Sequence, residues 1–298
     1  MGKQSREAIR VVSRVLLEAT VGRRIPTTAV FGQMAGVGFG TVQSALLDLE
    51  EAGAITVTSH GAHGRVLKSR DCVALWQAGN LPLIGSMPHP QSREFEGLAT
   101  ALSRTAATRG LLLQLLFRQG SLARLHALNE GRADFALLSL GAARNAEGID
   151  YIPLSSHTFY GEDAVVVITP SGGAPRYSGI VPADLDSYDH QLLSRTEFAQ
   201  CQLVHVPYQL IPERIASREF HSGIWHVTSG TPLAVARGLS IHPLKYPDLL
   251  VQETLSVATI AWRESDVAVA NLLKDVLDPE KFEAILREVD NGVIPKIY

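Results

Sequence analysis

Residues 22–67 restrict the fold of this chain most, because segments of different periodicity follow one another there. Pro26 and the two threonines after it mark the start of a short helix. A glycine-rich turn then leads into a second helix, whose apolar positions recur at helical spacing: Phe39, Val42, Leu46 and Leu49. Residues 54–58 alternate as a strand, and residues 65–67 can return as its partner. This order of helix, turn, helix and hairpin predicts a winged helix-turn-helix.

The second helix of such a domain lies in the major groove of DNA and reads bases with residues near its N-terminal end. The expected DNA contacts come from this helix, the start of the helix before it, the hairpin tip and the first helix of the chain: Arg6, Thr27, Thr28, Gly38, Phe39, Gly40, Thr41, Gln43, Ser44, His60, His63 and Arg65. Phe39 either contacts a thymine methyl group or anchors the turn in the core, and we expect the core.

The N-terminal residues also carry most of the positive charge. Residues 1–70 hold nine Lys or Arg against five Asp or Glu, a net charge of +4. Because the whole chain has a net charge of −3, residues 71–298 have a net charge of −7. Basic side chains attract DNA phosphates without reading sequence. The candidates for such contacts are Lys3, Arg6, Arg10, Arg14, Arg23, Arg24, Arg65, Lys68 and Arg70.

The same stretch resembles the DNA-binding domain of GntR-type repressors. The matching elements are Gly22, Ile25-Pro26, residues 37–42, Leu46 to Gly53, and Gly64-Arg65. The family usually has arginine where Phe39 and Gln43 stand. The whole chain is similar to the YhfZ-type regulators, and this resemblance implies a DNA-binding domain followed by a ligand-binding domain.

From Leu81 onward, strands alternate with helices, which predicts an α/β domain with a largely parallel sheet. We expect a DNA-binding domain over 1–70, a packed connector over 71–80 and a ligand-binding domain over 81–298. Residues 122–140 resemble a segment of type II periplasmic-binding proteins. That resemblance implies two lobes, about 81–165 with 257–298 and about 166–256, joined by crossovers at residues 163–169 and 256–262.

Ligands of open α/β sheets bind beyond the carboxyl ends of the strands. The residues that follow the predicted strands are therefore the expected ligand contacts: Ser86, Met87, His89, Gln119, Gly120, Ser121, Ser139, Tyr208, His226, Thr228, Ser229 and Thr231. Helix starts at Ser92, Ser121 and Thr231 would direct free N–H groups into this space, which suits a carboxylate or phosphate. We expect a small anionic or zwitterionic effector.

Other functions are disfavoured by missing motifs. The sequence has no H-E-x-x-H, G-x-S-x-G, P-loop or G-x-G-x-x-G, so we expect neither catalysis nor a cofactor or metal. Cys72 and Cys201 lie far apart and are expected to be unpaired thiols. Without a long apolar run or a signal-peptide segment, we expect a cytoplasmic protein that does not enter a membrane.

Two functions remain open. The first is a ligand-responsive transcriptional regulator that binds a double-stranded DNA operator as a homodimer, with half-sites about 34 Å apart. The alternative is a small-molecule binding protein or enzyme of periplasmic-binding-protein fold that uses its helix-turn-helix for dimerisation.

Overall fold

The computed structural model describes residues 2–59, 61, 64–155, 159–160, 164–226 and 238–298. Contacts along the chain divide it into two compact units. The first comprises Met1–Leu83, Arg104–Gln114 and Glu264–Asp278, and the second Ile84–Ser103, Leu115–Arg263 and Pro279–Tyr298. Two segments that the sequence assigns to the ligand-binding domain therefore cluster with the N-terminal residues.

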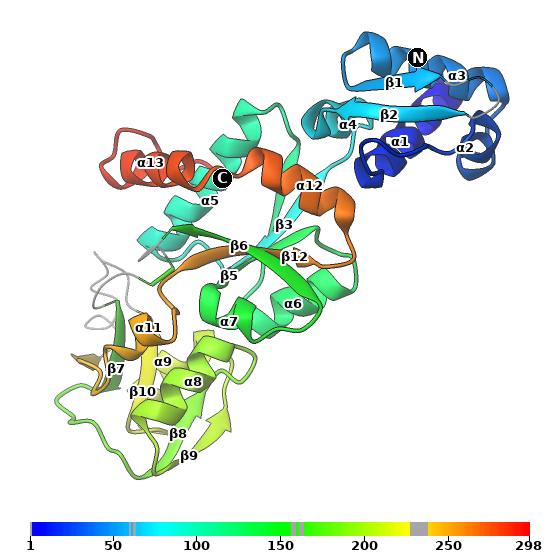
Figure 1. Ribbon diagram of the computed structural model, residues 1–298. Coiled ribbons are helices and arrows are strands. Elements are labelled where there is room, and N and C mark those ends of the chain that lie inside the picture. Colours follow the sequence, from blue (N-terminus) through cyan, green and yellow to red (C-terminus); the bar gives the residue numbers. More distant parts are fainter. Residues whose placement is uncertain (1, 60, 62–63, 156–158, 161–163, 227–237) are drawn as a thin grey trace. The chain divides into compact units, whose positions relative to one another are not determined.

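The first unit contains the elements of the N-terminal stretch in the expected order (Figure 1). They are α1 (Lys3–Glu18), α2 (Thr28–Ala35), α3 (Phe39–Glu51), β1 (Ile55–Ser59), β2 (Arg65–Arg70) and α4 (Cys72–Ala78). Thr27 caps α2 by accepting a 3.3 Å hydrogen bond from the Val30 N–H, and β1 pairs with β2 in an antiparallel hairpin. The core includes Leu16 of α1 and Leu46 of α3.

Phe39 departs from the sequence expectation, because its side chain is 62% exposed rather than in the core. The buried face of α3 begins three residues later, at Val42. The first turn of α3 therefore extends beyond the neighbouring residues that bury the rest of its apolar face. Helical spacing shows which residues share a face, but it does not show where that face stops being covered.

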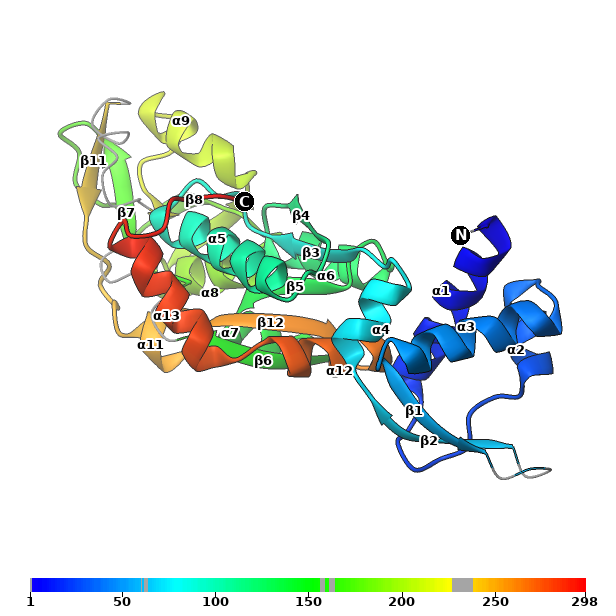
Figure 2. The ribbon, with the colours of Figure 1, turned by 90° about the horizontal axis from the view of Figure 1, so that it is seen from above.

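Helix α12 (Val267–Val276) packs against α1 and α4 within the first unit, and Figure 2 shows α4 and α12 next to each other. Arg14 of α1 lies 3.4 Å from Asp266, the N-cap of α12, and 5.9 Å from the ring of Trp76 on α4. Arg70 donates hydrogen bonds to the carbonyls of Leu16 and Ala19. Arg14 and Arg70 are thus engaged within the protein, which corrects their expected role as phosphate contacts.

The larger sheet has five strands in the order β4-β3-β5-β12-β6. The bounds are β3 (Leu83–Met87), β4 (Leu113–Phe117), β5 (Phe135–Ser139), β6 (Ile149–Ser155) and β12 (Ala258–Arg263). β3 and β5 are parallel, but β12 runs antiparallel to both β5 and β6. Helices α5 (Arg93–Thr108), α6 (Ser121–Asn129) and α7 (Leu140–Arg144) follow β3, β4 and β5, and α13 (Pro279–Asp290) packs against β6.

The second sheet of the second unit has the order β10-β7-β11 and is antiparallel throughout. The elements are β7 (Val165–Pro170), β8 (Gly179–Ala183), α8 (Tyr188–Glu197), β9 (Cys201–His205), η2 (Tyr208–Leu210), α9 (Ile211–Ala216), β10 (Gly223–His226), β11 (Leu239–His242) and α11 (Leu249–Gln252). β8 and β9 form a separate two-stranded sheet and are parallel to each other. The expectation of a largely parallel sheet is therefore wrong for this region, because β10 and β11 flank β7 in the opposite direction.

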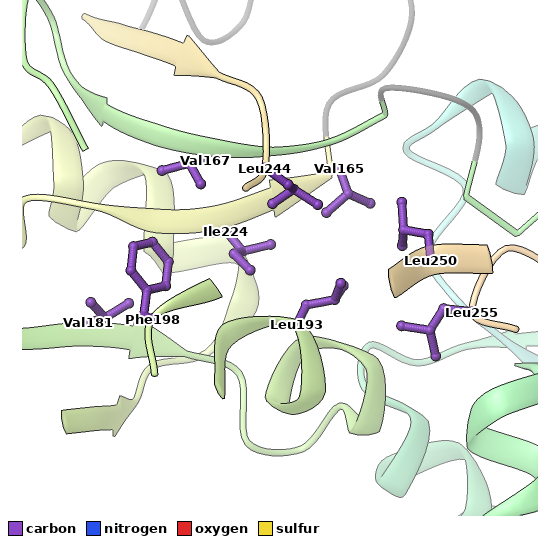
Figure 3. Packing of buried hydrophobic residues seen from close by; sticks show 9 residues of the cluster. All are labelled: Val165, Val167, Val181, Leu193, Phe198, Ile224, Leu244, Leu250 and Leu255. Atoms are coloured by element: carbon purple, nitrogen blue, oxygen red, sulfur yellow. The ribbon is translucent and has the colours of Figure 1, made fainter. Parts of the chain in front are cut away.

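A compact apolar cluster joins this sheet to α8 (Figure 3). Val167 and Ile224 project from β7 and β10 toward Leu193 of α8, with Phe198 beside them. These buried contacts fix α8 against β10, and both elements contribute to the site described below.

Three further sequence expectations concern a helix at Thr231, membrane-spanning segments and the two cysteines. The helix expected from Thr231 lies almost entirely in the segment 227–237, which the structure does not describe. Among the described residues, none of the helices has the length and apolar character needed to cross a bilayer. Both cysteines of the chain are free thiols.

Candidate ligand-binding site

A cavity of about 460 Å³ lies within the second unit. Its size suits a small organic molecule. The wall is formed by the segments after β3 and β4, the first turns of α5, α6 and α8, and the region from η2 to β10. The lining residues are Pro88, His89, Gln91, Ser92, Phe95, Gln119, Gly120, Arg124, Phe159, Tyr160, Val165, Ser187, His190, Leu193, Tyr208, Gln209, Ile224, Trp225 and His226.

Residues at three helix N-termini line this cavity. Ser92 caps α5 through a 3.1 Å hydrogen bond from the Phe95 N–H, as the sequence predicts, and Ser187 caps α8 by accepting from the His190 N–H. Gly120, the N-cap of α6, has a φ of +82° and a backbone so close to Asp186 that a Cβ atom would lie 2.7 Å from its carbonyl oxygen. Helix N-termini carry partial positive charge, so the cavity favours an anion.

Arg124 of α6 adds a full positive charge. Its side chain is buried, and it donates a 3.0 Å hydrogen bond from Nη1 to the Arg118 carbonyl. Its Nε has no hydrogen-bond partner among the described residues. Burial lowers the pKa of Arg124 to about 10, so the guanidinium remains protonated at neutral pH. A buried guanidinium with a free donor is an expected anchor for a carboxylate or phosphate.

Asp189 lies near Arg124 but already has two donors of its own. The hydroxyl of Ser139 donates to Oδ1 at 2.6 Å, and the hydroxyl of Tyr160 donates to Oδ2 at 3.1 Å. Burial raises the pKa of Asp189 to about 6, although both hydrogen bonds oppose this change. Asp189 is not among the described residues that line the cavity, whereas Arg124 is.

Aromatic rings form another part of the wall. Tyr208 and Trp225 stack with ring centres 4.3 Å apart and planes 11° apart. The His226 ring meets Phe95 and Tyr160 edge-on, with centres 5.4 and 5.0 Å away. The cavity therefore combines a buried guanidinium with flat aromatic surfaces, which suit a planar or hydrocarbon group.

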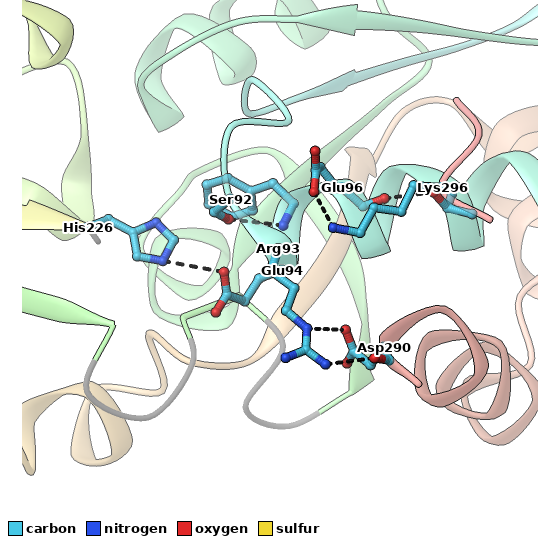
Figure 4. Close-up of polar contacts among 9 residues, drawn as sticks. Ser92, Arg93, Glu94, Glu96, His226, Asp290 and Lys296 are labelled. Atoms are coloured by element: carbon cyan, nitrogen blue, oxygen red, sulfur yellow. Dashed lines mark hydrogen bonds and ion pairs between the residues drawn. The ribbon is translucent and has the colours of Figure 1, made fainter. Parts of the chain in front are cut away.

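His226 also faces Glu94 of α5, with Nε2 and Oε2 separated by 3.7 Å (Figure 4). Burial lowers the pKa of His226 to about 4, against the opposing effect of Glu94, so the imidazole is neutral at pH 7. Two ion pairs hold the start of α5 to the C-terminal residues, Arg93 with Asp290 and Glu96 with Lys296.

The expected ligand contacts divide into three groups. Those that line the cavity are His89, Gln119, Gly120, Tyr208 and His226. Those that are buried away from it are Ser86, Met87, Ser121 and Ser139. Those outside the described residues are Thr228, Ser229 and Thr231.

Ser121 and Ser139 are occupied by structural hydrogen bonds, which corrects their expected role. The Ser121 hydroxyl accepts from the Tyr188 N–H at 2.8 Å, and Gly120 rather than Ser121 stands at the N-cap of α6. Ser139 caps α7 by accepting from the Ala142 N–H, in addition to its bond to Asp189.

Arg124 and Trp225 line the cavity but were not predicted from the sequence, and neither were Ser187 and His190 at the start of α8. Arg124 follows Ser121 by three residues in a predicted helix, so its position one turn inside the helix was the available signal. No such signal pointed to α8, because the segment before it is rich in proline, glycine and aspartate.

The expected DNA contacts lie in the first unit. Arg6, Thr27, Gly38, Phe39, Gly40, Gln43 and Ser44 are exposed, and Thr28, Thr41 and Arg65 are partly exposed. His60 and His63 lie outside the described residues. These described positions are accessible to a partner, although Thr27 also uses its hydroxyl to cap α2.

A separate polar cluster consists of Asp184, Asp186 and His205, in which one carboxylate oxygen of each aspartate and one ring nitrogen of the histidine lie within 4.8 Å of one another. Asp184 accepts a hydrogen bond from the Asp186 N–H, and His205 accepts one from the Leu185 N–H. These contacts order the turn that carries Asp186 to the N-terminus of α6, and the cluster does not line the cavity.

Comparisons with known proteins identify relatives of this architecture. The sequence model of the family described as YhfZ C-terminal domain matches residues 71–298. YhfZ of Escherichia coli (strain K12) is 26% identical over 297 residues, which cover 97% of this chain and 96% of that protein.

Two solved structures share the mixed α/β fold. YhfZ from Shigella flexneri superimposes with a TM-score of 0.60 and 24% identity, covering 76% of this chain and 98% of that one. Protein AF1704 from Archaeoglobus fulgidus gives a TM-score of 0.51 and 14% identity, covering 71% and 78% of the two chains. At these identities the similarity supports the fold alone.

Proposed function

The chain belongs to the YhfZ family, and we propose that it is a transcriptional regulator that binds DNA and responds to a small anionic or zwitterionic effector. In this proposal the second unit is a two-lobed domain like those of type II periplasmic-binding proteins. The effector binds in its cavity without being converted, and the regulator acts on double-stranded DNA as a cytoplasmic homodimer.

The observation that carries the effector half of the proposal is Arg124. A charged side chain is rarely buried unless it is paired. Arg124 satisfies one donor with a carbonyl, keeps its Nε free among the described residues and lines the cavity beside Gly120, where α6 begins. A carboxylate or phosphate placed there would complete its hydrogen bonds.

The DNA half rests on the first unit. Helices α2 and α3 are joined by a three-residue turn whose Gly36 has a φ of +63°, and the β1–β2 hairpin follows α3. We interpret this as a winged helix-turn-helix with α3 as the recognition helix. Its position at the basic end of the chain supports DNA as the partner.

The effector is tested by thermal unfolding of the full-length protein with a panel of small carboxylates and phosphate monoesters. We expect one class of anion to raise the melting temperature of the wild type and not that of Arg124→Gln. Arg195→Gln, a change of an exposed arginine on α8, is the matched control and should respond like the wild type. Equal stabilisation of all three proteins would reject the cavity as the binding site.

The regulator is tested by DNA binding of the same proteins, with the stabilising anion present or absent. Binding that the anion changes in the wild type and in Arg195→Gln, but not in Arg124→Gln, supports the proposal. Failure to bind any duplex, in a folded protein that still binds the anion, would favour a binding protein that uses the first unit for dimerisation.

A further inference from the structure

Charged side chains are unevenly distributed along α3. Its first nine residues, 39–47, contain no charged side chain, whereas all three of its acidic residues lie in the last four positions: Asp48, Glu50 and Glu51. Phe39 is 62% exposed, and Gln43 is exposed as well. Because they are four residues apart on one helix, the two side chains lie side by side on the same face.

These two side chains match the chemistry of A·T pairs. In the major groove, thymine presents a C5-methyl group that apolar side chains contact, and adenine presents N7 and N6 to the amide of a glutamine. Guanine is instead read by arginine or lysine, and neither is present on this half of α3. The surface is therefore suited to A·T pairs and lacks the usual means of recognising G·C pairs.

We propose that Phe39 and Gln43 determine the operator specificity of this protein, with Phe39 contacting a thymine methyl group and Gln43 an adenine in the same half-site. This inference rests on the proposed function, because it assigns the base contacts of the same recognition helix. It assigns to DNA the exposed apolar side chain that the sequence places in the core.

Charge and shape around Phe39 favour DNA over a second protein surface. Phe39 lines a shallow hollow together with Gln4 of α1, and Lys3 and Arg6 lie on either side of Gln4 in the chain. The first turn of α1 has no acidic residue. Gly38 and Gly40 flank Phe39, and a Cβ atom at either position would meet only open space. A phosphate backbone can thus approach α3 closely next to basic side chains.

The first experiment selects duplexes from a random pool with the full-length wild-type protein at low salt. We expect the enriched half-site to contain conserved A·T pairs. Each conserved thymine is then replaced by deoxyuridine, which removes only the methyl group. One replacement should weaken wild-type binding about fourfold, the effect of losing one buried methyl contact.

Three variants connect that loss to the protein. Phe39→Ala should bind the thymine and deoxyuridine duplexes within a factor of two of each other. Gln43→Ala should lose about tenfold in affinity, with the loss confined to duplexes that keep the contacted adenine. Leu47→Ala, which removes an exposed apolar side chain two turns further along α3, is the matched control and should retain the wild-type preference.

The outcomes separate this inference from the proposed function. Saturable binding with enrichment of G·C pairs overturns the inference and leaves the DNA-binding function intact, as does an equal deoxyuridine penalty in the wild type and Phe39→Ala. Absence of binding to the whole pool, by a folded protein, rejects the DNA-binding function itself.

Discussion

The hydroxyl of Ser139 donates a 2.6 Å hydrogen bond to Asp189, which joins the end of β5 to the first turn of α8. Ser121, at the start of α6, accepts from the backbone of Tyr188 beside it. The first turn of α8 is therefore attached both to β5 and to the start of α6, and Ser187 at the same turn lines the cavity. This attachment fixes one side of the cavity before any ligand binds.

The buried ionisable groups of the second unit predict how stability depends on pH. Burial lowers the pKa of His190 and of His226 to about 4, so from about pH 4 to 6.5 the unfolded chain binds more protons at these groups, and their contribution to stability rises with pH. Burial raises the pKa of Asp189 to about 6, so its contribution falls as pH rises from about 4 to 6. Burial also raises the pKa of Asp184, so this carboxyl group acts in the same direction as Asp189 and against the two histidines.

The variants Asp189→Asn and His190→Gln test this assignment through the slope of the unfolding free energy against pH. Asp189→Asn removes one opposing group, so the slope between pH 4 and 6 should increase by up to about 1.4 kcal/mol per pH unit. His190→Gln should decrease it by a similar amount. Urea unfolding at several pH values measures both slopes, and parallel curves for all three proteins would refute the assignment.

Gly120→Ala should disturb the cavity and the fold together. At φ +82° an alanine is strained, and its Cβ would lie 2.7 Å from the Asp186 carbonyl oxygen, so we expect a loss of about 1–3 kcal/mol or more. Gly148→Ala is the control, because Gly148 also has a positive φ but faces open space. Chemical denaturation compares the two, and an equal loss would show that Asp186 leaves room for the side chain.

Trp225 should report ligand binding by fluorescence. It lines the cavity in a stack with Tyr208, whereas Trp76 and Trp262 are buried outside it. An anion that raises the melting temperature should therefore change the emission of the wild type, and Trp225→Phe should abolish most of that change. A change that persists in Trp225→Phe would place the ligand elsewhere.

The ion pair between Arg14 and Asp266 should contribute little by itself. Arg14 is 40% exposed, and pairs of this kind typically contribute about 0–1 kcal/mol. Asp266→Asn retains an oxygen for the Val269 N–H, so the cap of α12 is preserved while the charge is removed. A double-mutant cycle with Arg14→Gln measures the pair, and a coupling of several kcal/mol would contradict this account.

The sequence allowed prediction of the elements that local rules determine. Helix α5 has a serine cap, and its start after Ser92 matches the expectation. The strand 135–139 lies in the segment 122–140 that resembles periplasmic-binding proteins, and all five of its residues are buried. In each case a cap or a run of one residue type decides the structure within a few residues.

The remaining features depend on contacts between distant segments. The antiparallel direction of β12 depends on its neighbours β5 and β6, which lie more than a hundred residues earlier. Ser139 follows a strand as expected, but its hydroxyl donates a hydrogen bond to Asp189, which lies fifty residues later in the chain. Arg124 becomes notable only because folding buries it in a cavity wall. The exposure of Phe39 could not be predicted either, because helical spacing does not show where the residues that bury a helix face end.

The most direct test of the central claim is a polarisation titration of the full-length protein with duplexes from the DNA upstream of its own gene. It is performed with competitor DNA at about 50 and 200 mM salt, with and without the stabilising anion. We predict saturable, salt-sensitive binding to one duplex, with an affinity that the anion changes in the wild type but not in Arg124→Gln. Binding that the anion leaves unchanged in both proteins, or no binding to any duplex, would contradict the account.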